Sequence, residues 1–146
     1  MKIALLVQRI LPPIWLGMNC AIAMEAQLKF QAPGITRELG LGIGKIVFTA
    51  LNRIELALGG LLLVAFFAST AVRKAQMIFG AILLILLVQT FWLMPNLIER
   101  IDLITAGNPP PDSSAHLLYI AFETGKIILL FALSVILNWQ SVNAHK

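Results

Sequence analysis

Apolar residues fill four stretches of the chain, each long enough to cross a lipid bilayer as a helix. They cover about residues 3–24, 46–72, 75–97 and 115–139. A transmembrane helix needs about 20 predominantly apolar residues, and the runs alternate too poorly to be barrel strands. Inside lipid, an α-helix satisfies all of its own backbone polar groups. The pattern therefore predicts an all-α, four-helix transmembrane bundle that forms a single integral membrane domain over residues 1–146.

Polar residues, glycine and proline separate the four stretches and predict where the chain turns. Asp112, Ser113 or Ser114 can cap the last helix, because prolines before them cannot continue a helix. An even number of spans places both termini on the same side of the membrane. The predicted connections are a polar segment over residues 25–45 with a turn at Pro33-Gly34, the charged pair Arg73-Lys74, and a loop containing Glu99, Arg100 and Asp102 that ends in Pro109–Pro111.

The first stretch has features of a signal peptide, with Lys2 before an apolar run and Ala21-Ile22-Ala23 after it. Arg9 and the pair Pro12-Pro13 break that run, which is untypical of a cleaved signal. We therefore expect the first stretch to be retained as a span that kinks near Pro12.

The composition agrees with a membrane protein and excludes several other classes. Hydrophobic residues make up 59% of the 146 residues, charged residues only 12%, and the mean hydropathy is +0.88. Soluble domains contain roughly 25% charged residues, so an ordinary cytosolic enzyme and a disordered chain are excluded. The single cysteine excludes a disulfide framework and a structural zinc cluster. The net charge of +4 comes from scattered basic residues without a basic stripe, so we expect no nucleic-acid partner.

Basic residues near the ends of the spans predict the orientation. The side with the termini carries five of them and the opposite side four, which favours cytoplasmic termini by a small margin. We therefore expect a multi-pass protein of a bacterial inner membrane. The two groups are Lys2, Arg9, Arg73, Lys74 and Lys146 on one side, and Lys29, Arg37, Lys45 and Arg100 on the other.

Polar side chains inside the predicted spans gather in one half of the bilayer. Since successive spans alternate in direction, residues late in spans one and three lie at the same depth as residues early in spans two and four. Charges exposed to hydrocarbon are costly, so we expect these side chains to face one another. Arg53 and Lys126 would balance the two glutamates. The predicted polar layer comprises Asn19, Asn52, Arg53, Glu55, Gln89, Asn96, His116, Tyr119, Glu123 and Lys126.

Three interpretations of this layer remain open. The side chains can be interhelical hydrogen bonds that hold the bundle together. They can form a binding site for a polar ligand, a lipid headgroup, a quinone or a proton, open to one face of the membrane. They can also bind a divalent metal through His116, Glu123 and Glu55, although no typical ligand spacing is present. Trp15, Trp92 and Trp139, like Tyr119, are expected to anchor the helices at the membrane interface.

The spacing Asn52-x-x-Glu55 is similar to a motif of the four-span glutathione and eicosanoid membrane enzymes. Size and number of spans also match that family. The resemblance implies an enzyme, but residues 45–51 lack the arginines that precede the motif in that family. Span four also lacks an arginine that would stabilise a thiolate.

A second resemblance covers nearly the whole chain. Its residues are Trp15–Met18, Leu51–Glu55 and Leu118–Glu123, followed by Lys126. These segments resemble a family of small bacterial four-span membrane proteins of unknown function, related to eukaryotic transmembrane protein 205. The resemblance implies a four-helix bundle and no established reaction.

Taken with the lack of catalytic motifs, these features predict a non-catalytic binding or accessory subunit of a membrane assembly. The expected partners are the lipid bilayer and either other membrane subunits or a second copy of the chain. No particular cofactor is implied. The alternatives are a proton-linked transporter of small molecules or metals and a glutathione-type enzyme.

Overall fold

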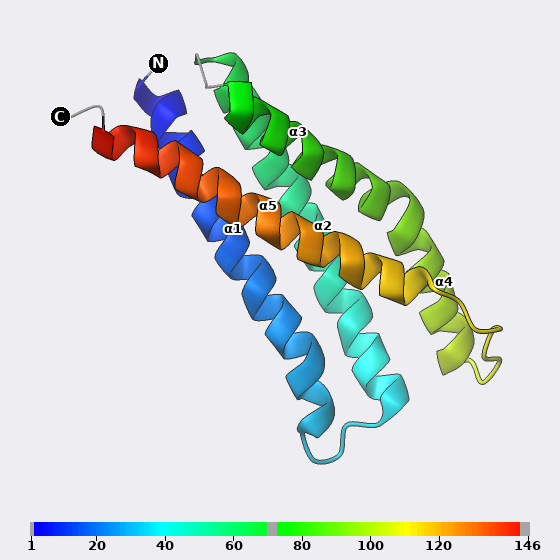
Figure 1. Cartoon of the computed structure of the whole chain (residues 1–146). Coiled ribbons are helices and arrows are strands. Elements are labelled where there is room, and N and C mark those ends of the chain that lie inside the picture. Colours follow the sequence, from blue (N-terminus) through cyan, green and yellow to red (C-terminus); the bar gives the residue numbers. More distant parts are fainter. Residues whose placement is uncertain (1, 70–72, 144–146) are drawn as a thin grey trace.

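A computed structural model describes residues 2–69 and 73–143 of the chain, with side chains up to residue 139. Within these ranges the protein contains helices and connecting turns, with no strand (Figure 1). The elements are α1 (Lys2–Leu28), the 3₁₀ turn η1 (Lys29–Gln31), α2 (Arg37–Phe67), α3 (Arg73–Val88), the π-helix η2 (Gln89–Leu93), α4 (Met94–Thr105) and α5 (Ala115–Asn143). Because α3, η2 and α4 follow one another without a break, they form one long third helix.

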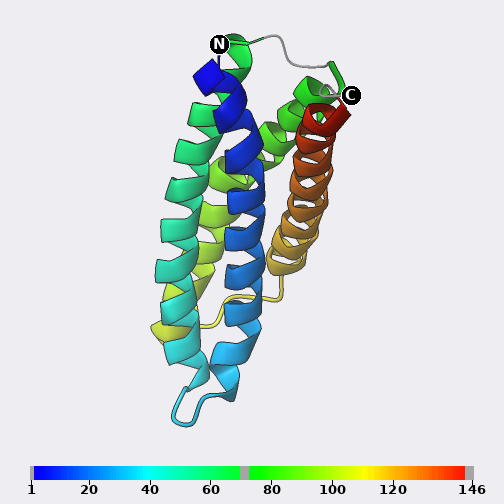
Figure 2. The same cartoon turned by 90° about the vertical axis from the view of Figure 1, so that its left-hand side faces the viewer.

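The four long helices pack as a closed ring. Helix α1 contacts α2 and α5, and the third helix contacts both α5, through α3, and α2, through α3 and α4. The start of α1 and the end of α5 lie at the same end of the bundle in both views (Figures 1 and 2). All four helices are long and apolar enough to cross a membrane. The predicted class, an all-α bundle of four spans, is therefore confirmed.

The helices extend beyond the apolar stretches that indicated them. Most of residues 25–45, expected to be a polar connection, is helical, because α1 continues to Leu28 and α2 already begins at Arg37. The Thr36 hydroxyl caps α2 by accepting a hydrogen bond from the Leu39 amide at 3.2 Å. The expected loop after the third span is helical as far as Thr105. A hydropathy pattern measures only the lipid-embedded part of a helix, whereas backbone hydrogen bonds and caps continue into the interface.

The second span also ends differently from its apolar pattern. Helix α2 ends at Phe67, and the Ala68 amide closes its last turn on the Val64 carbonyl at 3.0 Å. The end predicted near Val72 lies outside the described residues.

Helix α1 runs through Pro12 and Pro13 without ending. A proline has no N–H, so the carbonyl four residues earlier loses its helical donor. For Pro13 that carbonyl belongs to Arg9, and the Asn138 side chain of α5 donates to it at 3.4 Å. A neighbouring helix thus partly replaces the missing backbone hydrogen bond, as is common in membranes.

The π-helix η2 ends two residues before another proline, Pro95. Pro95 cannot donate to the carbonyl of Phe91, and its ring would crowd that carbonyl in a regular helix. The backbone widens here, and the Met94 amide donates to the Gln89 carbonyl, five residues earlier. A π-turn of this kind often lies at a functional site. It places Gln89 where the helix changes its pitch.

Apolar side chains fill the half of the bundle that contains the start of α1. Phe66 of α2 and Phe79 of α3 stack with ring centroids 4.8 Å apart. Gly59 lets α2 approach closely, because a Cβ there would lie 3.2 Å from Leu83 and 3.6 Å from Trp15. The buried core comprises Trp15, Leu62, Phe66, Ala75, Phe79, Ile82, Leu86, Leu130, Leu133 and Leu137.

Candidate functional site

A lysine lies at the centre of the bundle. The side chain of Lys126 on α5 is 0% exposed, and its Nζ contacts three acceptors from three helices. Glu55 Oε1 lies at 2.6 Å, Gln89 Oε1 at 2.8 Å and Glu123 Oε2 at 3.0 Å. An ammonium group has three N–H donors and no acceptor. Every donor of Lys126 therefore has a protein partner.

The two carboxylates share a second set of donors. Asn19 of α1 donates from its Nδ2 to Glu55 Oε1 at 2.9 Å and to Glu123 Oε1 at 2.8 Å. Trp15, one turn earlier on α1, donates from its indole to Glu55 Oε1 at 2.9 Å. Gln89 Nε2 donates to Glu123 Oε2 at 3.0 Å. We call these six residues, Trp15, Asn19, Glu55, Gln89, Glu123 and Lys126, the buried network.

The spacing of residues along the helices explains how four of the six side chains reach the network as two pairs. Trp15 and Asn19 are four residues apart on α1, and Glu123 and Lys126 are three apart on α5, so each pair lies on one helix face. Glu55 and Gln89 come from α2 and η2. All four long helices thus contribute, and the network connects opposite sides of the ring.

The network has an incomplete charge balance. Glu55 is 1% exposed and Glu123 9%, and among the described residues Lys126 is the only buried cation between them. Arg53, expected to balance the second glutamate, is exposed and outside the network. If both carboxyl groups are ionised, one negative charge remains uncompensated. One acceptor also lacks a partner, since the buried Asn19 Oδ1 makes no hydrogen bond.

Two further residues of the predicted layer lie close to the network. Asn52, partly buried, donates to Thr90 Oγ1 at 2.8 Å, and Thr90 in turn donates to the Leu86 carbonyl at 2.7 Å. Tyr119 is buried in a small apolar cluster, with its ring edge-on to Phe48 at 5.6 Å. Asn52 and Glu55 therefore contact different groups.

Three residues of the predicted layer are exposed. These are Arg53, Asn96 and His116, of which Asn96 donates to its own helix at the Trp92 carbonyl. Consecutive polar residues on a helix point in different directions, so a shared depth did not guarantee a shared face. Within the described residues, no group of three His, Cys, Asp or Glu side chains could hold a metal ion. His116 thus does not join Glu55 and Glu123 in such a group.

The sequence analysis assigned Trp15 to the membrane interface, and this prediction is wrong. Trp15 is 0% exposed and belongs to the buried network. Its position four residues before Asn19 was the available signal. Tyr119 is likewise buried, whereas Trp92 and Trp139 are 55% and 67% exposed, as expected of side chains that face lipid.

A second buried polar contact lies in the otherwise apolar half. Gln8 of α1 is 2% exposed and donates from Nε2 to the Ala65 carbonyl at 2.8 Å and to Ser69 Oγ at 2.6 Å. Ser69 also donates to the Ala65 carbonyl at 3.0 Å. The polar groups of the bundle therefore lie on both sides of the apolar core, although the charged ones lie on one side only.

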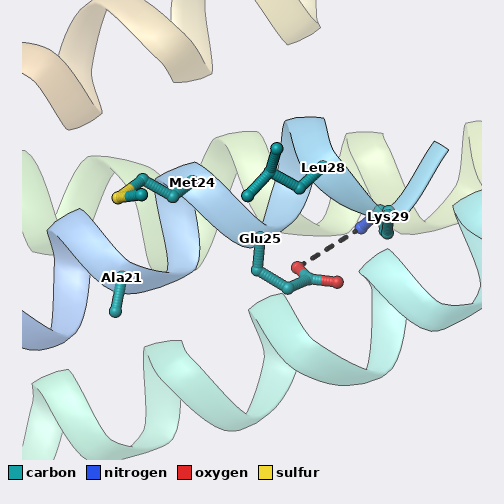
Figure 3. Close-up of a pocket in the computed structure, with 5 residues that line it drawn as sticks. All are labelled: Ala21, Met24, Glu25, Leu28 and Lys29. Carbon is teal, nitrogen blue, oxygen red and sulfur yellow. Dashed lines mark ion pairs between the residues drawn. The ribbon is translucent and has the colours of Figure 1, made fainter. Parts of the chain in front are cut away.

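An open pocket of about 540 Å³ lies beside the end of α1 (Figure 3). It is lined by Ala21, Met24, Glu25, Leu28 and Lys29. Glu25 and Lys29 form an ion pair at 3.6 Å across one turn. The lining contains none of the network residues, so this pocket does not give access to the network.

Together, the helices and the network define the class of protein. The chain is a small integral membrane protein with four membrane-spanning helices around a buried ion pair. No protein-family model matches the chain, and no curated protein or solved structure matches it either.

Proposed function

We propose that the protein acts without catalysis, as a binding or accessory subunit of a membrane assembly. The observation that carries this proposal is the set of partners around Lys126, whose three N–H donors all bind other side chains of the same chain. A site that binds a substrate keeps donors or acceptors free for it. In this network nearly all donors and acceptors bind other side chains of the network.

The geometry of the network supports a structural role in holding four helices together. Lipid gives little hydrophobic drive for helix association, so packing and interhelical hydrogen bonds determine how the helices meet. A fully connected polar network also favours one arrangement over others, since any shift leaves a buried charge without a partner. A rigid bundle of this kind is suited to present a fixed surface to a neighbouring subunit.

The outer surface of the bundle supports the same proposal. Large apolar side chains such as Phe67, Phe91 and Phe131 are exposed. Lipid covers such residues in an isolated bundle, and another membrane helix can replace that lipid. The partner in this proposal is therefore another membrane subunit or a second copy of the chain.

The membrane in which the protein lies and the family that it resembles are further parts of this proposal. The distribution of basic residues favours cytoplasmic termini in a bacterial inner membrane. The segments around Trp15, Glu55 and Glu123 resemble the four-span family related to transmembrane protein 205. Three of the conspicuous residues in those segments contact one another or Lys126 in the buried network.

Photo-crosslinking in living cells tests the proposal. A photoreactive amino acid is placed singly at exposed apolar positions on each long helix, for example at Ile14, Val64, Leu84 and Phe131. We expect adducts of one discrete mass, confined to adjacent positions on one side of the bundle. Adducts at no position, or equally at all positions, would contradict a specific membrane partner.

A network variant separates a structural role from ligand binding. Replacing Glu55 and Glu123 with Gln and Lys126 with Met removes the charges and keeps the approximate side-chain volumes. We expect this variant to fold and to form the same adduct. Loss of the adduct in a variant that is folded and present at normal abundance would mean that the charges themselves take part in function.

A further inference from the structure

We propose that the buried network binds one proton at neutral pH, held by the carboxyl pair Glu55 and Glu123, with Glu123 as the group that exchanges it. The proposal stands on the network alone and does not depend on an accessory role. It begins from the shortage of positive charge, because two carboxyl groups share a single buried ammonium, that of Lys126.

In the part of the chain that the structure describes, few charged or titratable groups surround the pair. Helix α2 contributes Glu55, α5 contributes Tyr119, Glu123 and Lys126, and the residues that face the pair from α1 and η2 are the uncharged Trp15, Asn19 and Gln89. The nearest candidate for a second cation, Arg53, is exposed. Two carboxyl groups that share one site tend to keep a proton between them, and burial in lipid strengthens that tendency.

The hydrogen bonds treat the two carboxyl groups alike, because each accepts three. Glu55 accepts all three on Oε1, from Trp15, Asn19 and Lys126, at 2.6–2.9 Å. Glu123 accepts from Asn19 on Oε1 and from Gln89 and Lys126 on Oε2, at 2.8–3.0 Å. Neither carboxyl group is therefore singled out by its hydrogen bonds.

Accessibility decides which group exchanges the proton. The side chain of Glu123 is 11% exposed, whereas those of Glu55 and Lys126 are 1% and 0% exposed. Glu123 is therefore the member of the charged set with the most exposed surface, and we place the exchange of the proton there. Uptake or release of one proton there changes the network between neutral and singly negative.

Infrared spectroscopy of the purified full-length protein in lipid nanodiscs tests the proposal. A protonated carboxyl group has a C=O stretching band that is separate from the carboxylate bands. At pH 7 we expect a band equivalent to one carboxyl group per chain, which disappears as the pH is raised. Absence of that band in the wild-type protein at pH 7 would overturn the proposal without any variant.

Two variants assign the band, and a salt titration identifies the cation. Glu123→Gln should remove the band, because the remaining pair of Glu55 and Lys126 is neutral. The matched change Glu25→Gln alters a partly exposed carboxyl group outside the network and should leave the band unchanged. A band that persists in folded Glu123→Gln would contradict the assignment.

Replacement of choline chloride by sodium chloride should have no effect on the band of the wild-type protein. Loss of the band in sodium chloride would identify a sodium site instead of a proton site.

Discussion

The two halves of the bundle are held together in different ways. In one half, charged and amide side chains from all four long helices bind one another around Lys126. In the other half, apolar side chains such as Leu62, Ile82 and Leu130 pack at 0% exposure, with the buried and uncharged Gln8 at the far edge. Packing tolerates small changes in any one side chain, whereas a charge network fails when one member is removed. A single substitution in the polar half should therefore lower the free energy of unfolding more than one in the apolar half.

Removing the central cation should have the largest effect. Lys126→Met leaves Glu55 and Glu123 buried without the cation that they share, and breaking a buried ion pair from one side costs about 3–5 kcal/mol. We expect the free energy of unfolding, measured by steric trapping in bicelles, to fall by that amount. Lys45→Met is the matched control, since the ion pair of Lys45 with Asp102 is largely exposed and such pairs contribute about 1 kcal/mol or less. Equal losses in the two variants would contradict a special role for the network.

A cavity in the apolar half should have the next largest effect. Leu130→Ala removes a side chain that is 0% exposed, and we expect a loss of about 2–3 kcal/mol in the free energy of unfolding. Ile128→Ala on the same helix alters a side chain that is 61% exposed and should change stability by about 0.5 kcal/mol or less. The same bicelle assay measures both. A loss at Leu130 larger than that at Lys126 would reverse the comparison between the halves.

The boundary between the halves can be tested with two adjacent glycines. A Cβ on Gly59 would lie 3.2 Å from Leu83 and 3.5 Å from Leu86, while one on Gly60 would meet no atom within 4 Å. We expect Gly59→Ala to lower the free energy of unfolding by about 1 kcal/mol through overpacking. Gly60→Ala should be neutral or stabilise the helix by up to about 1 kcal/mol. The opposite order would show that α2 faces its neighbours differently.

An effect comparable to that at Gly59 is expected for the uncharged polar contact. Gln8→Leu removes the hydrogen bonds to Ala65 and Ser69, and an interhelical hydrogen bond in a membrane contributes about 0.6 kcal/mol on average. The Ala65 carbonyl keeps its hydrogen bond from Ser69, and the Ser69 hydroxyl, which loses its donor, is only partly buried. The exposed change Gln76→Leu serves as the control and should have no measurable effect. A loss at Gln8 as large as that expected at Lys126 would show that charge is not what distinguishes the halves.

The four spans were readable from the sequence because lipid imposes one strong requirement on them. Each span needs a long run of apolar residues, and such a run is easy to recognise in a sequence. The ends of the helices were less predictable, since Thr36 as a cap and the continuation of α4 to Thr105 depend on local hydrogen bonds outside the lipid.

The depth of a residue in the membrane was easier to predict than the direction in which its side chain points. The alternation of spans placed the candidate polar residues in one half of the bilayer, and the structure brings Asn19, Glu55, Gln89, Glu123 and Lys126 into one network. Arg53 and His116 have similar depth but face outward. Facing depends on how each helix is rotated in the ring, and that rotation is set by packing such as the close approach at Gly59.

The most direct test of the network compares Lys126→Met alone with the same change combined with Glu55→Gln and Glu123→Gln. If buried charges hold the helices in register, removal of both carboxyl groups should restore at least about 2 kcal/mol of the stability lost in the single variant, because no unpaired charge remains. The free energy of unfolding in bicelles measures this recovery. A combined variant as unstable as Lys126→Met, or less stable, would mean that shape and not charge makes these residues necessary.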